Sequence, residues 1–236
     1  MSLARAVLAT FQALCNGLAC TPPNKTRPNT RYHTEELYIL QIAPLIFKCH
    51  QIIAYGCAFF EVLFYLRTLL PTPTSPTAIA LSTIVCPFSP PPPPTLLPLT
   101  PSFILGVLAV ALGAYIRLDC FRALGQLFTF DLTLHPEHRL ITSRFYAYVR
   151  HPAYTGSMLL VFGLTFSHLT RGAWMTECGP LRGKSAGVVW AAWWLWTWCV
   201  GISRADAEDK QMRGVFGKEW DAWAAAVHWW FLPGLI

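Results

Sequence analysis

Charged side chains are scarce in this chain of 236 residues. They make up 13% of the residues, against about 25% in a typical soluble domain, while 54% of the residues are apolar. This balance argues against a soluble globular enzyme. It also argues against a disordered chain, which needs low hydrophobicity and high charge. An integral membrane protein is the class that remains. The net charge of +6 is too modest and too scattered for a nucleic-acid binder, so we expect no nucleic-acid partner.

Closely spaced cysteine pairs are also missing. None of the eight cysteines forms a CxxC pair, which weakens a zinc or redox interpretation. Most lie in or beside apolar runs, where thiols usually act as small hydrophobic groups. The spacing of His135, His138 and His151 matches no common metal-ligand pattern. The sequence therefore predicts neither a disulfide framework nor a metal site.

Long apolar stretches recur along the chain. A helix that crosses a bilayer needs about 20 mostly apolar residues. Five stretches qualify or nearly do: about 3–19, 37–66, 102–118, 154–169 and 185–203. We therefore predict an all-α polytopic membrane protein with about five transmembrane helices. The first stretch also resembles a signal peptide, because Arg5 near its start is followed by apolar residues, but no small-x-small cleavage site closes it, and we favour a retained span.

Two features of the first half of the chain qualify this outline. The second stretch contains Lys48, His50 and Glu61, which we expect to face other helices or to lie near an interface. Residues 71–101 are rich in proline, which at that density neither continues a helix nor pairs in a sheet. We predict an extended connector there; a polyproline ligand for a partner domain is the alternative.

Two polar segments remain, at 119–150 and from Arg204 onward. The fourth and fifth stretches form a hairpin between them, so both segments emerge on the same side of the membrane. That side collects 12 basic residues and the other side five. Because basic loops favour the cytoplasmic side, we expect both polar segments in the cytosol.

The residue types in these segments suit an anionic or polar ligand. Pro152 fits the first turn of a helix, which would place Arg150 and His151 at the positive end of the fourth span. Backbone N–H groups there can bind a carboxylate. Arg204 and Glu208 stand four residues apart and would share one helical face. The plainer alternative is an interfacial basic loop and a surface ion pair without chemistry.

The end of the chain has its own pattern. Trp220, Trp223, Val227 and Trp230 share one face if 219–231 is helical. We predict a helix that lies on the membrane and covers the ligand site formed by the two polar segments, or a purely structural anchor.

These segments also carry two halves of a known signature. The first half is His138-Arg139-Leu140-Ile141-Thr142-Ser143 followed by Tyr146-Ala147-Tyr148-Val149-Arg150-His151-Pro152-Ala153-Tyr154-Thr155-Gly156. The second half is Arg204, Glu208-Asp209, Phe216-Gly217, Trp220, Trp223 and the ending Phe231-Leu232-Pro233-Gly234-Leu235-Ile236. Both halves in this order resemble the isoprenylcysteine carboxyl methyltransferase family, and residues 20–24 are similar to its fungal members.

The resemblance implies a function and a location. Family members are multi-pass enzymes of the endoplasmic reticulum membrane that use S-adenosylmethionine to methylate the C-terminal carboxylate of prenylated cysteine. It also implies prenylated CaaX proteins and membrane lipids as partners, and a cytosolic cofactor pocket made from the loop before the fourth helix and the C-terminal tail. Residues 1–118 would then form the N-terminal spans with the connector, and 119–236 the methyltransferase core.

By matching positions, the resemblance also implies the site. Arg204 should bind the substrate and, with Glu208, serve catalysis. The positions expected to contact the cofactor are His135, His138, Arg139, Leu140, Ile141, Tyr146, His151, Pro152, Ala153, Tyr154 and Glu208. The chain departs from the family pattern at His135 (usually Gln), at Arg144 (usually Gly) and at Trp220 and Trp223 (usually Tyr). The glycine at the Arg144 position suggests a backbone with positive φ.

Three other functions stay open. A phospholipid N-methyltransferase shares the cofactor and the architecture but methylates an amine, which would not need Arg204. A non-catalytic membrane scaffold would bind no S-adenosylmethionine. An NADPH-dependent sterol reductase carries a relative of the R-H-P string, but the tail shows no further match.

Overall fold

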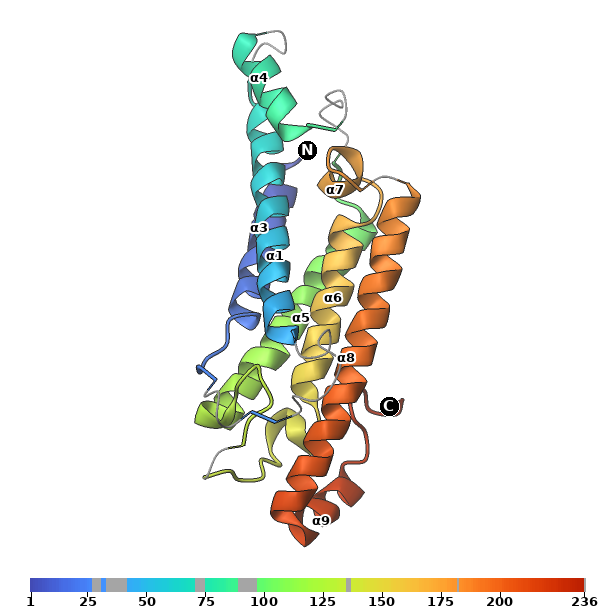
Figure 1. Cartoon of the computed structure of the whole chain (residues 1–236). Helices are drawn as coiled ribbons and strands as arrows, with labels where there is room; N and C mark the ends of the chain where they lie inside the picture. The colour runs from blue at the N-terminus through green and yellow to red at the C-terminus, as the bar shows by residue number, and fades with distance from the viewer. Residues whose placement is uncertain are drawn as a thin grey trace. The chain divides into compact units, whose positions relative to one another are not determined.

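Helices make up most of the chain. The computed structural model describes residues 1–26, 31–32, 42–70, 75–88, 97–134, 137–181 and 183–235. The α-helices are α1 (Leu3–Ala19), α3 (Ala43–Thr68), α4 (Pro76–Val85), α5 (Pro101–Leu124), α6 (Pro152–His168), α7 (Trp174–Glu177), α8 (Lys184–Phe216) and α9 (Lys218–Ala226), and the 3₁₀ turns are η2 (Gly125–Leu127) and η3 (Arg144–Ala147) (Figure 1). Within the described ranges, β pairing is limited to one isolated bridge between Arg31 and Thr133. The predicted all-α class is confirmed.

Three of these helices, α3, α5 and α8, are long and apolar enough to cross a membrane. Helices α1 and α6 have 17 residues each and stand where the sequence predicted spans. Their role as spans stays a prediction. Helix α8 runs 13 residues past the predicted end at Ser203, so Arg204 and Glu208 belong to the same helix as the apolar stretch.

The proline-rich connector is not simply extended, as predicted, because it contains α4. Ser75 caps this helix by accepting a hydrogen bond from the backbone N of Ala78 at 3.2 Å. Pro76 occupies the first turn, where its missing N–H costs nothing. The next proline is Pro87, so residues 77–86 are free of proline and a helix fits between the two. The average proline content of residues 71–101 does not reveal this proline-free segment.

The prediction of no disulfide is wrong for one pair. Cys86 and Cys178 are bonded, although 92 residues separate them, and the other six cysteines form no disulfide. The bond lies in a buried apolar cluster that includes Phe64, Leu97 and Trp174. Spacing rules detect pairs that are close in sequence, whereas folding brings these two segments together.

The chain divides into two compact units. The first comprises Met1–Gly17, His50–Ala111 and Leu160–Trp194. Its centre is an ion pair in which Arg5 Nε and Nη2 donate to Glu61 at 3.0 and 2.8 Å, with both side chains fully buried. The predicted inward orientation of Glu61 is confirmed. His50 is buried too and accepts a hydrogen bond from Trp193 at 2.9 Å.

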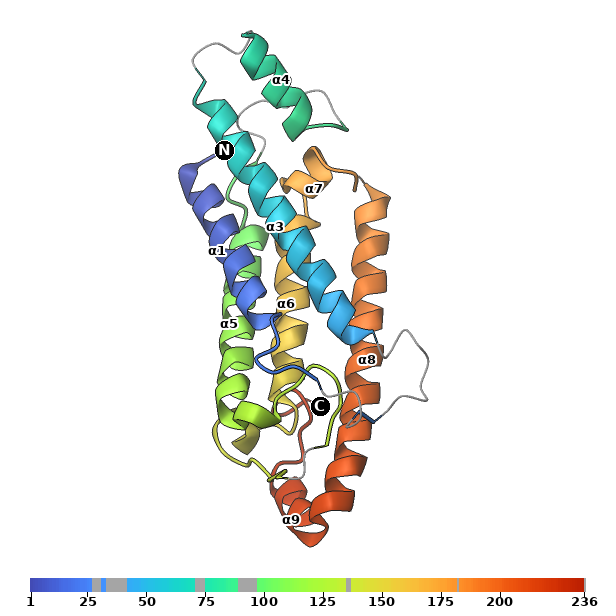
Figure 2. The ribbon, with the colours of Figure 1, turned by 60° about the vertical axis from the view of Figure 1, so that its left-hand side comes forward.

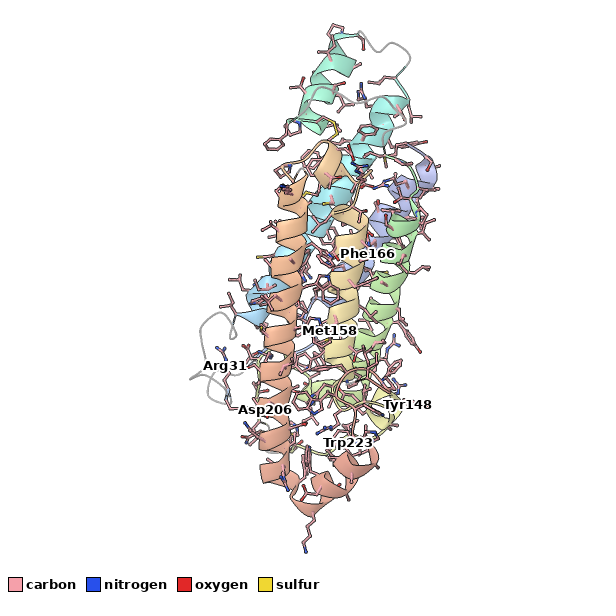
Figure 3. The ribbon with its side chains drawn as sticks, turned by 90° about the vertical axis from the view of Figure 1, so that its right-hand side faces the viewer. Arg31, Tyr148, Met158, Phe166, Asp206 and Trp223 are labelled. Atoms are coloured by element: carbon pink, nitrogen blue, oxygen red, sulfur yellow. A yellow bond between two sulfur atoms is a disulfide. The ribbon has the colours of Figure 1, made fainter. Side chains whose placement is uncertain are left out.

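The second unit comprises Leu18–Cys49, Leu112–Leu159 and Leu195–Ile236. Phe121, Phe128 and Phe130 form one aromatic cluster of its core. A second cluster gathers around Met158, labelled in Figure 3, and Phe231 near the end of the chain. Both halves of the sequence signature lie mainly in this unit.

Glycines allow α5 and α6 to approach closely, and the two helices run side by side in both Figure 1 and Figure 2. In the first unit, a Cβ at Gly163 would lie 2.5 Å from the carbonyl oxygen of Gly106. In the second unit, a Cβ at Gly156 would lie 2.8 Å from the carbonyl oxygen of Gly113. Small residues at helix contacts are typical of membrane bundles.

We predict that Gly163→Ala destabilises the protein by about 1–3 kcal/mol, because the new methyl group meets backbone that can move only with its helix. Gly187→Ala in α8 is the matched control. A Cβ there meets nothing within 4 Å, so it should be neutral or gain up to about 1 kcal/mol of helix propensity. Thermal unfolding in detergent compares the two; equal unfolding temperatures would contradict the close approach.

Candidate functional site

The end of the chain is bound to the start of α6. The backbone N–H groups of Arg150 and His151 donate to the carbonyl oxygens of Trp229 and Trp230 at 2.8 and 2.9 Å. The Thr155 hydroxyl donates to the carbonyl oxygen of Phe231 at 2.6 Å. N–H groups at a helix start need such partners, because no earlier helical turn supplies them.

These bonds change the predicted ending. A helix over 219–231 is wrong beyond Ala226, where α9 stops. Val227 and Trp230 therefore do not continue the helical face that starts at Trp220. The backbone after Ala226 pairs with the motif segment, and a helix would have used the same carbonyl groups internally.

Helix α8 brings Arg204 and Glu208 to Tyr154 of α6. Arg204 is 6% exposed and donates to the Phe130 carbonyl oxygen at 2.6 Å and to the Tyr154 hydroxyl at 3.3 Å. That hydroxyl in turn donates to Glu208 Oε1 at 2.5 Å. The i, i+4 spacing therefore places both side chains on one phenol, as the shared helical face predicts.

His151 lies between two carboxylates. Its Nδ1 is 3.2 Å from Glu208 Oε2, and its Nε2 is 3.0 Å from Asp209 Oδ1. Burial by itself lowers the pKa of His151, but the hydrogen bonds and charges of Asp209 and Glu208 outweigh it and raise the pKa to about 9. The ring is therefore an imidazolium at neutral pH.

Arg150 completes the arrangement. It pairs with Asp209 at 2.5 Å, and its guanidinium lies over the rings of Trp220 and Trp230 at 5.8 and 5.6 Å. We call the connected set the site relay: Arg204, Tyr154, Glu208, His151, Asp209 and Arg150. Three cations and two carboxylates give it one net positive charge.

The loop before α6 lies near the same part of the second unit. The His138 ring is 6.1 Å from that of Phe216, at the end of α8. Trp223 of α9, labelled in Figure 3, donates to the Tyr146 carbonyl oxygen at 3.3 Å. Burial and the neighbouring Cys120 raise the pKa of the Tyr146 phenol.

The other residues predicted to contact the cofactor do not belong to the site relay. Leu140 and Ile141 are half-buried and Arg139 is exposed in the irregular segment after His138, while Pro152 and Ala153 form the first turn of α6. His135 lies outside the described residues.

Arg144 has the backbone expected of the glycine that usually stands there. Its φ of 60° is the one positive value at a non-glycine residue in the described part of the chain. Its guanidinium pairs with Asp119 at 2.5 Å. An ion pair thus accompanies a backbone conformation that glycine would adopt without strain.

Sequence reasoning missed Tyr32. Its backbone N donates to the Leu132 carbonyl oxygen at 3.0 Å, while Arg31 pairs with Asp131 at 2.9 Å. Burial and the charge of Glu208 raise the pKa of the Tyr32 phenol, which places it near the site relay. No motif marks this residue, because it reaches the site from the loop after α1.

The fold and site define a helical protein with membrane-length helices and a charged relay built from two polar segments. Residues 104–181 match the model of the isoprenylcysteine carboxyl methyltransferase family. Two curated relatives, from Oryza sativa subsp. indica and subsp. japonica, are each named "Probable protein-S-isoprenylcysteine O-methyltransferase" and are 29% identical over 126 residues. The matched region covers 52% of this chain and 58% of each relative. No solved structure matches. The resemblance to this family inferred from the motifs is confirmed, and the similarity to its fungal members stays a prediction.

The raised pKa of His151 predicts a stability that depends on pH. Because an unfolded histidine has a pKa of about 6.5, the folded protein holds this proton more tightly. The extra stability is complete below about pH 6.5 and is lost as the pH rises through about 9, a change on the order of 3 kcal/mol.

Thermal unfolding of the wild type and of His151→Gln over this range measures the effect. The advantage of the wild type should shrink as the pH rises. His228→Gln, at an exposed side chain, is the control and should track the wild type. A constant gap between wild type and His151→Gln would contradict the buried imidazolium.

Proposed function

We propose that this protein transfers a methyl group from S-adenosylmethionine to the C-terminal carboxylate of prenylated cysteine in CaaX-processed proteins, forming a methyl ester. Residues 119–236 supply the methyltransferase core. The observation that carries the proposal is the site relay, which joins both halves of the family signature through hydrogen bonds. The family match over 104–181 and the names of the curated relatives support it.

The charge of the site relay favours a carboxylate substrate. One net positive charge attracts an anion and disfavours the protonated amine of a phospholipid headgroup. Arg204 uses Nε and Nη2 within the protein, and its Nη1 has no hydrogen bond among the described residues. That nitrogen can hold an oxygen of the substrate carboxylate.

The Glu208 carboxylate and the residues that orient it are suited to binding S-adenosylmethionine. The Glu208 side chain is 30% exposed while Tyr154 and His151 hold it in place, so an oriented carboxylate faces the surroundings. A carboxylate in this position can attract the positively charged sulfonium of S-adenosylmethionine. Both ring nitrogens of His151 are already engaged, so we assign His151 to orienting Glu208. When bound, the cofactor supplies an electrophilic methyl group.

Methyl transfer to a carboxylate requires no general acid or general base. A carboxylate is ionised at neutral pH and attacks the methyl carbon directly, and the neutral thioether leaves. The protein must align the two reactants and remove water from the nucleophile. The buried Arg204 can do both, because its planar guanidinium fixes the orientation of the carboxylate in a site with little water.

We predict that Arg204→Ala lowers methylation of a farnesylcysteine analogue about 100-fold, since a charged hydrogen bond to the nucleophile is lost. Binding of S-adenosylmethionine, measured by calorimetry, should persist. Lys210→Ala, an exposed change on the same helix, should leave both unchanged. Equal loss of methylation and of cofactor binding would contradict the substrate role of Arg204.

One competition assay distinguishes the proposed function from the alternatives. Membranes that contain the protein are offered farnesylcysteine and phosphatidylethanolamine in competition. Methylation of the amine would favour a phospholipid N-methyltransferase. A scaffold would methylate neither substrate and would bind no S-adenosylmethionine.

We further propose an endoplasmic reticulum membrane protein with the site relay facing the cytosol. The disulfide supports this orientation. Cys86 lies in the connector before α5 and Cys178 between α6 and α8, both on the side predicted to face away from the cytosol. Disulfides persist in oxidising compartments such as the lumen of that organelle.

Sealed microsomes test the orientation. A membrane-impermeant maleimide should leave Lys184→Cys, an exposed position at the start of α8, unlabelled until the vesicles are permeabilised. Gly214→Cys, near the end of α8 where no atom lies within 4 Å of the new Cβ, should be labelled in sealed vesicles. Labelling of Lys184→Cys in sealed vesicles, with Gly214→Cys protected, would contradict the proposed orientation.

A further inference from the structure

One buried cation of the second unit takes no part in the site relay. Arg117 of α5 is 3% exposed. Its Nε donates to the Ala19 carbonyl oxygen at 2.8 Å, and its Nη1 donates to the Ala153 carbonyl oxygen at 3.3 Å and to the Ser157 hydroxyl at 2.6 Å. These bonds use the one N–H of Nε and both of Nη1. Nη2 is buried and has no partner in the described chain.

Among the residues that the structure describes, no carboxylate lies against the Arg117 guanidinium as a counter-ion. Rings pack around its guanidinium, with Phe47, Phe130 and Phe121 centred 4.5, 5.0 and 5.6 Å from Cζ. Its titratable neighbours are thiols and phenols: Cys20, Cys120, Tyr146 and Tyr154. None of the ion pairs among the described residues includes Arg117.

Arg117 nevertheless adjoins the site relay. Phe130 connects the two arginines, since its ring lies by Arg117 and its carbonyl oxygen accepts from Arg204. Ala153, which accepts from Arg117, directly precedes Tyr154. The unpartnered Nη2 thus belongs to the region where two helices present the site residues.

A buried charge without a partner is costly, and more so on a helix long enough to cross a membrane. Such residues commonly mark substrate pathways. The two unused N–H groups of Nη2, with no carboxylate beside them in the described part of the chain, favour an anionic oxygen as partner.

We infer that Arg117 is a second carboxylate-binding residue of this site and holds, through Nη2, a carboxylate of one of the two reactants. This inference rests on the proposed function, in which the lipid substrate and the methyl donor each carry a carboxylate. Arg117 would supply the counter-charge from α5, while Arg204 acts from α8.

The test compares each ligand with an analogue that lacks the carboxylate. One arm measures the affinity of N-acetyl farnesylcysteine relative to its amide. The other arm measures S-adenosylmethionine relative to its decarboxylated form. Both ratios are measured for the full-length wild type and for Arg117→Met, which keeps an apolar stem between the rings. Ser157→Ala is the control, because it removes a hydrogen bond of Arg117 and keeps the charge.

In Arg117→Met, we expect one of the two ratios to fall about tenfold or more, with no fall in Ser157→Ala. A fall in the lipid arm assigns the carboxylate of the substrate, and a fall in the donor arm that of the cofactor. Unchanged ratios in a folded Arg117→Met would overturn the inference while leaving the proposed function intact. If Arg117→Met does not fold, Arg117→Gln, which keeps donors toward Ala19 and Ser157, decides by the same comparison. A wild type that binds neither ligand would instead defeat the proposed function.

Discussion

The position of His151 between Glu208 and Asp209 is the interaction on which the site depends. An imidazolium with a carboxylate at each nitrogen fixes the register of α8 against the start of α6. Glu208 then reaches Tyr154, and Tyr154 reaches Arg204. The same histidine holds the end of the chain through its backbone N–H. His151 thus orients the acidic pair through its ring and holds the tail through its backbone.

Buried charge is handled differently in the two units. In the first, Arg5 and Glu61 neutralise each other in a buried ion pair, and Arg5 also donates to the Pro98 carbonyl oxygen. In the second, Arg117 has aromatic neighbours and backbone acceptors, and no described carboxylate pairs with it. A paired ion contributes to assembly. An unpaired one has charge left for a ligand, which is why the second unit is the better candidate for chemistry.

Several elements were readable from local pattern. Helix α1 has the predicted bounds, α6 begins at Pro152, and the i, i+4 pair of α8 shares a face. The high proline content of the whole connector predicted an extended chain, whereas the proline-free residues between Pro76 and Pro87 form helix α4. The helix over 219–231 was too long, because periodicity says nothing of carbonyl groups that find partners elsewhere.

The sequence by itself determined the membrane class, the positions of most helices and the two polar segments, since these follow from local composition, periodicity and motif strings. Only the tertiary structure decided that Tyr32 lies near the site, that Cys86 meets Cys178, and that Arg117 is buried with no partner for Nη2 among the described residues. Each of these depends on contacts between residues far apart in the chain. Such contacts are set by how helices pack, and no single segment encodes them.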